Sequence, residues 1–222
     1  IPFSSSVYLF TETIIKYGSD EIKKNVLPKL VTGEIVGTYA VAEDMSAITE
    51  STLSCAVEGD SVTGAKIAVP DAELATHAVV LVKGTKGPEL RLVDLNSDGV
   101  EISLQKNLDK SRSFYKVAFN NAQSSLLGDQ GSGWESHVHI MDQAAVLFAF
   151  EQVGGSQQAL DMAKEYAMER YAFGRQIGSY QAIKHKLADM YVAVTLAKSN
   201  CYYGAWALSS ESSELPLQPL HE

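Results

Sequence analysis

The sequence has few of the features that mark exported, metal-binding or membrane proteins. Its two cysteines, Cys55 and Cys201, lie far apart and lack the spacing of a metal motif, so neither a disulfide framework nor a metal site is indicated. A reducing cytoplasm is therefore the expected location. No apolar run approaches the roughly 20 residues that cross a bilayer, and the first residues show no basic-then-apolar signal pattern. We expect no membrane partner and no export.

Positive charge is also scarce. The chain has 18 Lys and Arg against 27 Asp and Glu, which gives a formal net charge of −9. This balance argues against a nucleic-acid partner, and any anionic ligand must be held by a local group of basic side chains. The chain starts at Ile1 rather than methionine and ends in "ELPLQPLHE" without a closing element. We therefore expect a fragment of a longer protein.

The remaining composition is that of a globular protein. With 222 residues, of which 45% are hydrophobic, the chain can bury the core of one large domain or two small ones. Residues 1–33 have helical spacing, a "YGSDE" turn and capping sequence, and an end marked by Pro28 and Gly33. We predict an α+β multi-domain protein whose N-terminal part, 1–33, is helical.

A pattern of period two replaces the helical one in residues 34–130. Short runs bounded by Gly, Asp, Asn or Pro follow one another: "VGTYAVAE", "STLSCAVEG", "HAVVLVKG", "ELRLVDL", "GVEISLQ" and "YKVAFNN". Such alternation with regular turns is typical of antiparallel sheets. We predict a middle antiparallel β-barrel or sandwich.

The last part, 131–222, is helical again. Apolar residues recur at helical spacing over 134–170 and 180–209, and these two long helices would form half of an antiparallel bundle. The stretch "LGDQGSGWE" before them is rich in glycine. It lacks the lysine of a phosphate loop, so we interpret it as the hinge into the bundle.

The order helix, strand, helix and the corner "ERYAFGRQIGSYQAIKHKLADM" (residues 169–190) together resemble the acyl-CoA dehydrogenase family. The likeness runs through essentially the whole chain, and the corner is its most specific part. It implies an N-terminal helical domain, a middle β domain and a C-terminal four-helix bundle, of which this chain would contain the end of the first, the second and two bundle helices. It also implies FAD as cofactor and α,β-desaturation of an acyl-CoA thioester.

The corner carries the residues that the resemblance assigns to FAD. Arg170 ends a helix, where a cation is favoured, and its fork of donors suits a diphosphate; the alternative is an ordinary exposed charge at a helix end. By resemblance, Arg170 would pair with the pyrophosphate of an FAD bound mainly by the neighbouring subunit, Phe173 would pack along it and Gln181 would hydrogen-bond to it. The family's hydroxyl residue before the phenylalanine is Ala172 here, so one donor is missing.

The flavin-facing strands depart from the family pattern. The family's threonine and serine on the first strand, which contact the flavin and the phosphate or thioester, are Ala42 and Ile48 here, and neither offers a side-chain hydrogen bond. Backbone groups of Tyr39, Val41 and Ala42 remain as cofactor contacts. A second strand of the family carries an aromatic residue that covers the flavin, followed by a hydroxyl donor. In the matching stretch "GAKIAVPD" the aromatic is replaced by Ala68 and the hydroxyl donor by Pro70.

No catalytic base can be assigned, so the catalytic residue is unknown. Most family members carry the glutamate that removes the α-proton in later bundle helices, and others carry it where this chain has Ala144 and Ala145. Glu151 lies in the apolar stretch "AVLFAFEQVGG" and has two interpretations. It is either a general base with a raised pKa or, as we favour, a residue facing a subunit interface or solvent.

Asp142 matches a family aspartate on the CoA side of the acyl channel, and is assigned with Ile48 to substrate binding; the alternative is ordinary first-turn helix charge. His137, His139 and Asp142 share a helix face, but no second cluster supports a metal site.

Two function classes remain. The first is an acyl-CoA dehydrogenase subunit that forms a dimer or tetramer, with itself or a related subunit, and that passes electrons to an electron-transfer flavoprotein. The second is a non-catalytic structural paralogue or fragment that only associates with such subunits.

Overall fold

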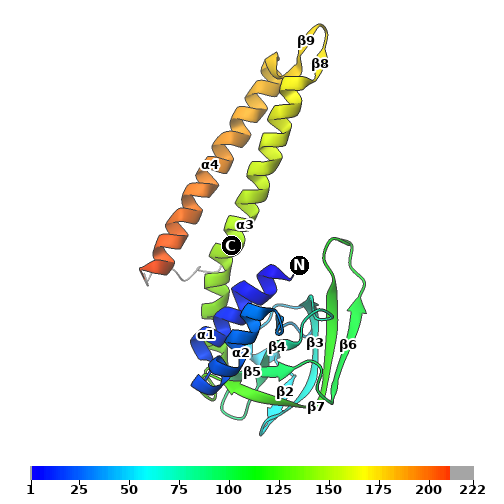
Figure 1. Cartoon of the computed structure of the whole chain (residues 1–222), viewed down its shortest axis with the longest axis vertical. Coiled ribbons are helices and arrows are strands. Elements are labelled where there is room, and N and C mark those ends of the chain that lie inside the picture. The colour runs from blue at the N-terminus through cyan, green and yellow to red at the C-terminus, as the bar shows by residue number, and fades with distance from the viewer. Residues whose placement is uncertain (1, 211–222) are drawn as a thin grey trace. The chain divides into compact units, whose positions relative to one another are not determined.

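The computed structural model of the chain describes residues 2–210 (Figure 1). These residues fall into two compact units, the first ending at Met141 and the second beginning at Asp142. Helices come first, then strands, then helices again, so the chain is of the mixed α+β class that the change of period predicts. None of the helices in this described part is both long and apolar enough to cross a membrane.

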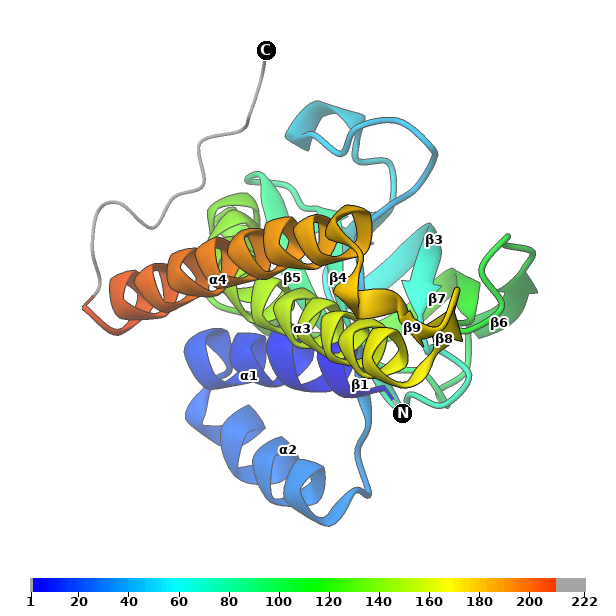
Figure 2. The same cartoon turned by 90° about the horizontal axis from the view of Figure 1, so that it is seen from above.

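The first unit opens with helices. They are the π-helix η1 (Ser4–Thr11), α1 (Glu12–Tyr17) and α2 (Asp20–Thr32). Ser19 caps α2 by accepting a hydrogen bond from the N–H of Ile22, and Gly33 ends α2 with a φ of +78°. Phe10 and Ile14 are fully buried, whereas α2 lies on the outer side of α1 (Figure 2). The first two helices therefore attach this segment to the sheet.

Seven strands and one short 3-10 turn follow. They are β1 (Gly37–Ala40), the turn η2 (Glu50–Thr52), β2 (Ala56–Glu58), β3 (Ser61–Pro70), β4 (His77–Lys83), β5 (Pro88–Asp94), β6 (Val100–Gln105) and β7 (Phe114–Leu127). The pairings run β4–β2–β3–β7–β5 and return to β4, while β1 adds to β4 and β6 to β7. Five strands thus close on themselves as a small barrel, one of the two predicted arrangements.

The pairings are mainly antiparallel, as predicted, but β4 has two parallel neighbours. β1 runs parallel to β4, with Gly37 opposite His77 and Ala40 opposite Val80. β2 also meets β4 in parallel, at a single position. Parallel neighbours need a long crossover, and residues 41–76 supply it between β1 and β4. Alternation of period two shows which side chains face inward but not the direction of a neighbouring strand.

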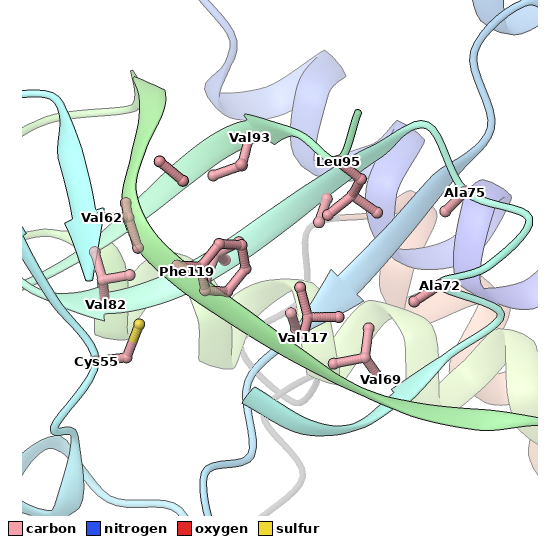
Figure 3. Packing of buried hydrophobic residues seen from close by; sticks show 14 of the residues in the cluster. Cys55, Val62, Val69, Ala72, Ala75, Val82, Val93, Leu95, Val117 and Phe119 are labelled. Carbon is pink, nitrogen blue, oxygen red and sulfur yellow. The ribbon is translucent and has the colours of Figure 1, made fainter. Parts of the chain in front are cut away.

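The barrel core consists mainly of small and branched apolar side chains (Figure 3). β4 is buried on both faces from Ala78 to Val82, and Val117 and Phe119 of β7 pack in the same cluster. Cys55 lies in this core as a free thiol. The thiol therefore packs as a small apolar side chain, and burial raises its pKa to about 11.

The second unit contains a helical hairpin. Its long helices are α3 (Gly133–Glu169), which begins in the first unit, and α4 (Gln181–Ser209). Phe150 meets Tyr202 edge to face with ring centroids 5.5 Å apart, and Gly204 lets α4 approach Val146. Val146 and Phe150 therefore lie on the face of α3 that contacts α4. Met190 of α4 is 42% exposed, because two helices alone cannot enclose a bundle core.

Candidate functional site

The corner between α3 and α4 is a small β-hairpin followed by a short turn. Its elements are β8 (Tyr171–Ala172), β9 (Arg175–Gln176) and the 3-10 turn η3 (Ile177–Ser179). Ala172 pairs with Arg175, so the loop between the strands has two residues. Phe173 and Gly174 have φ angles of +51° and +78°, which is the pattern of the tight hairpin turn that follows strand twist. The sequence pattern did not predict this hairpin, because strands of two residues have no measurable period.

Main-chain hydrogen bonds fix the base of this corner. The N–H of Arg170 donates to the carbonyl of Tyr166 at 2.9 Å, which completes the last turn of α3. The N–H of Ile177 donates to the carbonyl of Arg170 at 2.8 Å and closes the hairpin. Gly178 lies against the backbone of Ala167, where an added Cβ would come within 2.9 Å of the carbonyl oxygen. The corner is therefore held tightly to the end of α3.

The three residues assigned to FAD by resemblance all lie at this corner and all are exposed. Arg170 directly follows α3, Phe173 occupies the turn with 96% of its surface exposed, and Gln181 is the first residue of α4. Within residues 2–210, the structure shows no partner for the Arg170 guanidinium or the Gln181 amide. Phe173 is also in the left-handed region, which is costly for a residue with a Cβ. An exposed aromatic in a strained turn beside an unpaired cation is a surface suited to binding a ligand.

The electrostatics of the corner favour an anion. The N-cap residue of α4, Tyr180, makes no side-chain capping bond, and the first turn of α4 contains no acidic residue. The positive end of the helix dipole therefore adds to the charge of Arg170. The corner is therefore a candidate for the local basic group that a chain of net charge −9 needs to hold an anion.

The flavin-strand residues lie in the first unit, at the end of β1. Tyr39 is 3% exposed, and its hydroxyl lies 3.2 Å from Nδ1 of His137, with the two rings stacked. Its side chain therefore faces the interior and is not available to a cofactor. Burial raises the pKa of Tyr39 well above its usual range, and burial together with the charge of Lys66 lowers the pKa of His137 to about 4.

The main chain after β1 is held by a buried ion pair. Lys66, whose side chain is fully buried, donates to the carbonyl of Val41 at 3.0 Å and to Oε1 of Glu43 at 2.7 Å. The carbonyl of Ala42 accepts from the N–H of Ile67 at 2.8 Å. Burial lowers the pKa of Lys66. A lysine inside the alternating strand β3 is a sequence signal of a paired buried charge, because an unpaired charge would be costly to bury there.

Glu43 anchors the loop that follows β1. Its carboxylate accepts from the N–H groups of Ser54 and Cys55 at 2.7 and 3.1 Å, and from the Ser54 hydroxyl. Burial alone would raise the pKa of Glu43, but the hydrogen bonds from Lys66 and Ser54 bring this pKa below its usual value. Ile48 lies in the closed loop, half-buried, where it lines a small hollow with Val41.

The second flavin-facing strand ends in an irregular segment. Ala68 is exposed with a φ of +51°, and its N–H donates to the Gln105 side chain at 2.6 Å. The register of β3 against β7 shifts between Lys66 and Val69, and the carbonyl of Pro70 accepts from the Thr38 hydroxyl at 2.6 Å. Neither Ala68 nor Pro70 offers a side-chain hydrogen bond.

The carboxylates weighed as catalytic groups lie on α3. Glu151 is exposed in the described helical hairpin, which agrees with the favoured interpretation, a position facing a subunit interface or solvent. Asp142 is half-buried, at the start of the second unit. Ala144 is fully buried and Ala145 half-buried, at the positions that the resemblance assigns to the base of some family members. Among the described residues no group of three or more His, Cys, Asp or Glu is placed to hold a metal.

Comparison with known proteins matches this architecture. Residues 131–218 match the model "Acyl-CoA dehydrogenase, C-terminal domain". The chain is 30% identical over 205 residues to the mitochondrial isovaleryl-CoA dehydrogenase of Oryza sativa subsp. japonica, covering 85% of this chain and 50% of the relative. It thus spans about half the length of the curated relatives that it matches.

Solved structures agree on the fold. Butyryl-CoA dehydrogenase from Megasphaera elsdenii superposes with a TM-score of 0.88 at 22% identity, covering 96% of this chain and 59% of that one. A structure described as an FAD-dependent dehydrogenase superposes with a TM-score of 0.85 at 26% identity, covering 95% and 60%. The family model over residues 131–218 and the sequence relatives identify the chain as a member of the acyl-CoA dehydrogenase family.

Proposed function

We propose that this chain is part of an FAD-dependent acyl-CoA dehydrogenase and that it contributes the α3–α4 corner to an FAD held mainly by a partner subunit. The observation that carries this proposal is the contrast between the two sets of predicted contacts. Arg170, Phe173 and Gln181 are exposed at one corner, with the cation and the amide unpaired among the described residues. Ala42 and Ile48, in contrast, offer the flavin no polar side chain.

The residues present fit the diphosphate half of the cofactor. Arg170 can pair two of its N–H groups with phosphate oxygens, the uncapped start of α4 adds backbone donors, and Phe173 offers an aromatic face. FAD, when bound, supplies the acceptor for the hydride that leaves the β-carbon of the acyl thioester. The α-proton must go to a carboxylate that lies outside the matching positions Ala144 and Ala145.

The substrate-side assignments remain proposals. Ile48 would border the thioester end of an acyl-CoA, and Asp142 would lie on the CoA side of the acyl channel. We also propose an electron-transferring flavoprotein as the electron acceptor, as the resemblance to the family implies. The cytoplasmic location stays a prediction.

Coexpression tests the proposal. The chain alone should purify largely colourless, because two or three lost polar contacts of about 1 kcal/mol each weaken FAD binding roughly 30- to 200-fold. Coexpressed with an acyl-CoA dehydrogenase subunit that keeps the family's threonine and serine, the complex should show a flavin spectrum with about one FAD per pair of chains.

Arg170→Ala should then remove most of this flavin, because the diphosphate loses its bidentate cation. Lys198→Ala is the matched control, since Lys198 is an exposed cation on α4 far along the helix from the corner. An isolated chain that carries one FAD per protomer, and keeps it after the Arg170 change, would contradict the proposal.

The second candidate is a non-catalytic paralogue that only associates with dehydrogenase subunits. The alanines at positions 144 and 145 favour it. A coexpressed complex that forms stoichiometrically but retains the same flavin with and without Arg170 would support this alternative.

A further inference from the structure

Tyr180 touches both strands of the corner hairpin. Its hydroxyl donates to the carbonyl of Ala172 at 2.8 Å, and the guanidinium carbon of Arg175 lies 4.0 Å from the centroid of its ring. Ala172 and Arg175 are the paired residues that flank the two-residue turn. The side chain of Tyr180 therefore contacts the hairpin on both sides of the Phe173–Gly174 turn.

The main chain of Tyr180 is itself fixed at the start of α4. Its N–H donates to the carbonyl of Ile177 at 3.1 Å, and its carbonyl accepts from the N–H groups of Ile183 and Lys184 at 3.1 and 2.9 Å. The side chain is half-buried. The ring thus connects the hairpin rigidly to the helix that follows it.

The turn needs such support. A residue with a Cβ in the left-handed region costs on the order of 1–3 kcal/mol, and an isolated two-stranded hairpin is marginally stable at best. Phe173, the residue in question, has a φ of +51° and contributes no packing of its own, since it is 96% exposed. The strained conformation must therefore be imposed by its neighbours, and Tyr180 supplies a hydrogen bond and a cation–π contact directly beside it.

The same geometry separates the roles of the two corner arginines. Arg175 is stacked on Tyr180, whereas the guanidinium of Arg170 has no partner among residues 2–210. Arg175 is thus part of the support, and Arg170 is the cation left for a ligand.

We propose that Tyr180 is a positioning residue that holds the Phe173–Gly174 turn in its left-handed conformation and so presents Phe173 to the cofactor beside Arg170. The identity of that cofactor rests on the proposed function. The support of the turn rests on contacts within the corner.

Amide hydrogen exchange tests the support without any cofactor. Tyr180→Phe keeps the ring and removes only the hydroxyl. The N–H of Ile177 donates to the carbonyl of Arg170 and closes the hairpin. Its hydrogen exchange should then become about fivefold faster, because one ordinary hydrogen bond contributes about 1 kcal/mol. Tyr171→Phe is the matched control, because Tyr171 is 62% exposed on the same hairpin and its hydroxyl has no acceptor among the described residues. Equal exchange in Tyr180→Phe and the wild type would overturn the proposal.

FAD dissociation from the coexpressed complex tests the positioning. Tyr180→Phe should speed FAD release about fivefold. In a Phe173→Ala background the same change should add nothing, because the side chain that Tyr180 positions is gone. A merely structural role would speed release in both backgrounds, and that result would overturn the positioning role.

The two proposals fail differently. If Arg170→Ala leaves the rate of FAD release unchanged, the corner does not hold FAD, so the proposed function fails and the cofactor part of this inference fails with it. If Arg170→Ala speeds release while Tyr180→Phe does not, the proposed function stands and the inference is wrong.

Discussion

Lys66 is the buried charge on which the end of β1 depends. It pairs with Glu43 and also holds the carbonyl of Val41, so it connects β3 to the main chain that we assign to the flavin. A buried pair of this kind is weak evidence for net stability, yet breaking it is costly because the remaining charge loses its partner.

We therefore expect Lys66→Met to lower the free energy of unfolding by about 2–3 kcal/mol. This is less than the usual cost of breaking a buried ion pair, because the Glu43 carboxylate keeps its hydrogen bonds from Ser54 and Cys55. Urea unfolding measures the change. Lys116→Met, on the exposed side of β7, is the control and should change stability little. Equal midpoints for the two variants would show that the ion pair contributes nothing.

His137 should make stability depend on pH. Its pKa of about 4 in the folded state lies below the unfolded value of 6.5, mainly because of burial, and the groups facing it are Tyr39, Trp134 and the charge of Lys66. The unfolded chain thus binds the proton first as pH falls, so stability is lost from pH 6.5 down to about 4 and is level below that.

Between pH 7 and pH 5, protonation linked to His137 should lower the free energy of unfolding by about 2 kcal/mol. Trp134, whose ring lies 5.6 Å from His137, provides a fluorescence signal for urea unfolding of the first unit. His137→Phe should remove that part of the pH dependence, whereas His185→Asn, an exposed histidine on α4, should leave it unchanged. The same pH slope in all three proteins would contradict the prediction.

Among secondary-structure elements, the corner hairpin combines a poor local conformation with the specific family motif. Phe173 occupies a position where Asn or Gly would be better tolerated. Such strain at an exposed residue is typical of functional sites.

Phe173→Asn should therefore stabilise the hairpin, slowing exchange of the Ile177 amide several-fold, since about 1 kcal/mol of strain is relieved. The same variant should hold less FAD in the coexpressed complex, because the aromatic contact is lost. Hydrogen exchange and the flavin spectrum measure the two effects. Faster amide exchange in the variant would show that the phenylalanine itself supports the turn.

At the scale of the whole molecule, the helical hairpin leaves a large apolar surface uncovered. An open groove of about 600 Å³ lies between α3 and α4, lined mostly by small and apolar side chains such as Ala149, Val153 and Gly204. Tyr191, Leu196 and Trp206 are more than half exposed on α4. Half a bundle with this surface requires further polypeptide, from the rest of a longer chain or from a partner subunit.

We expect the isolated chain to self-associate or to bind an apolar dye. Leu196→Lys should reduce both self-association and dye binding, because Leu196 is an apolar side chain of α4 that is 61% exposed. Thr195→Lys is the control, one position away. Light scattering and dye fluorescence at micromolar concentration measure the outcome. A monodisperse wild-type monomer without dye binding would show that the open face needs no cover.

Local sequence pattern determined the order of elements. The spacing of apolar residues placed the two long helices within one residue of their observed ends, and Ser19 with Gly33 marked the bounds of α2. Pro28, which was also predicted to mark the end of this helix, lies inside it. These features depend on neighbours in sequence, through capping, turn conformation and the burial of one face. The corner motif likewise groups Arg170, Phe173 and Gln181 within twelve consecutive residues, so their proximity follows from the sequence alone.

Only the tertiary structure decided what depends on contacts between distant residues. The parallel pairing of β1 with β4 joins segments separated by residues 41–76, and strand period is the same for either direction. The Lys66–Glu43 pair and the Tyr39–His137 contact bring together residues far apart in the sequence. The contacts of Tyr180 with Ala172 and Arg175 depend on how the start of α4 packs against the hairpin. Hydrophobic periodicity does not predict such contacts.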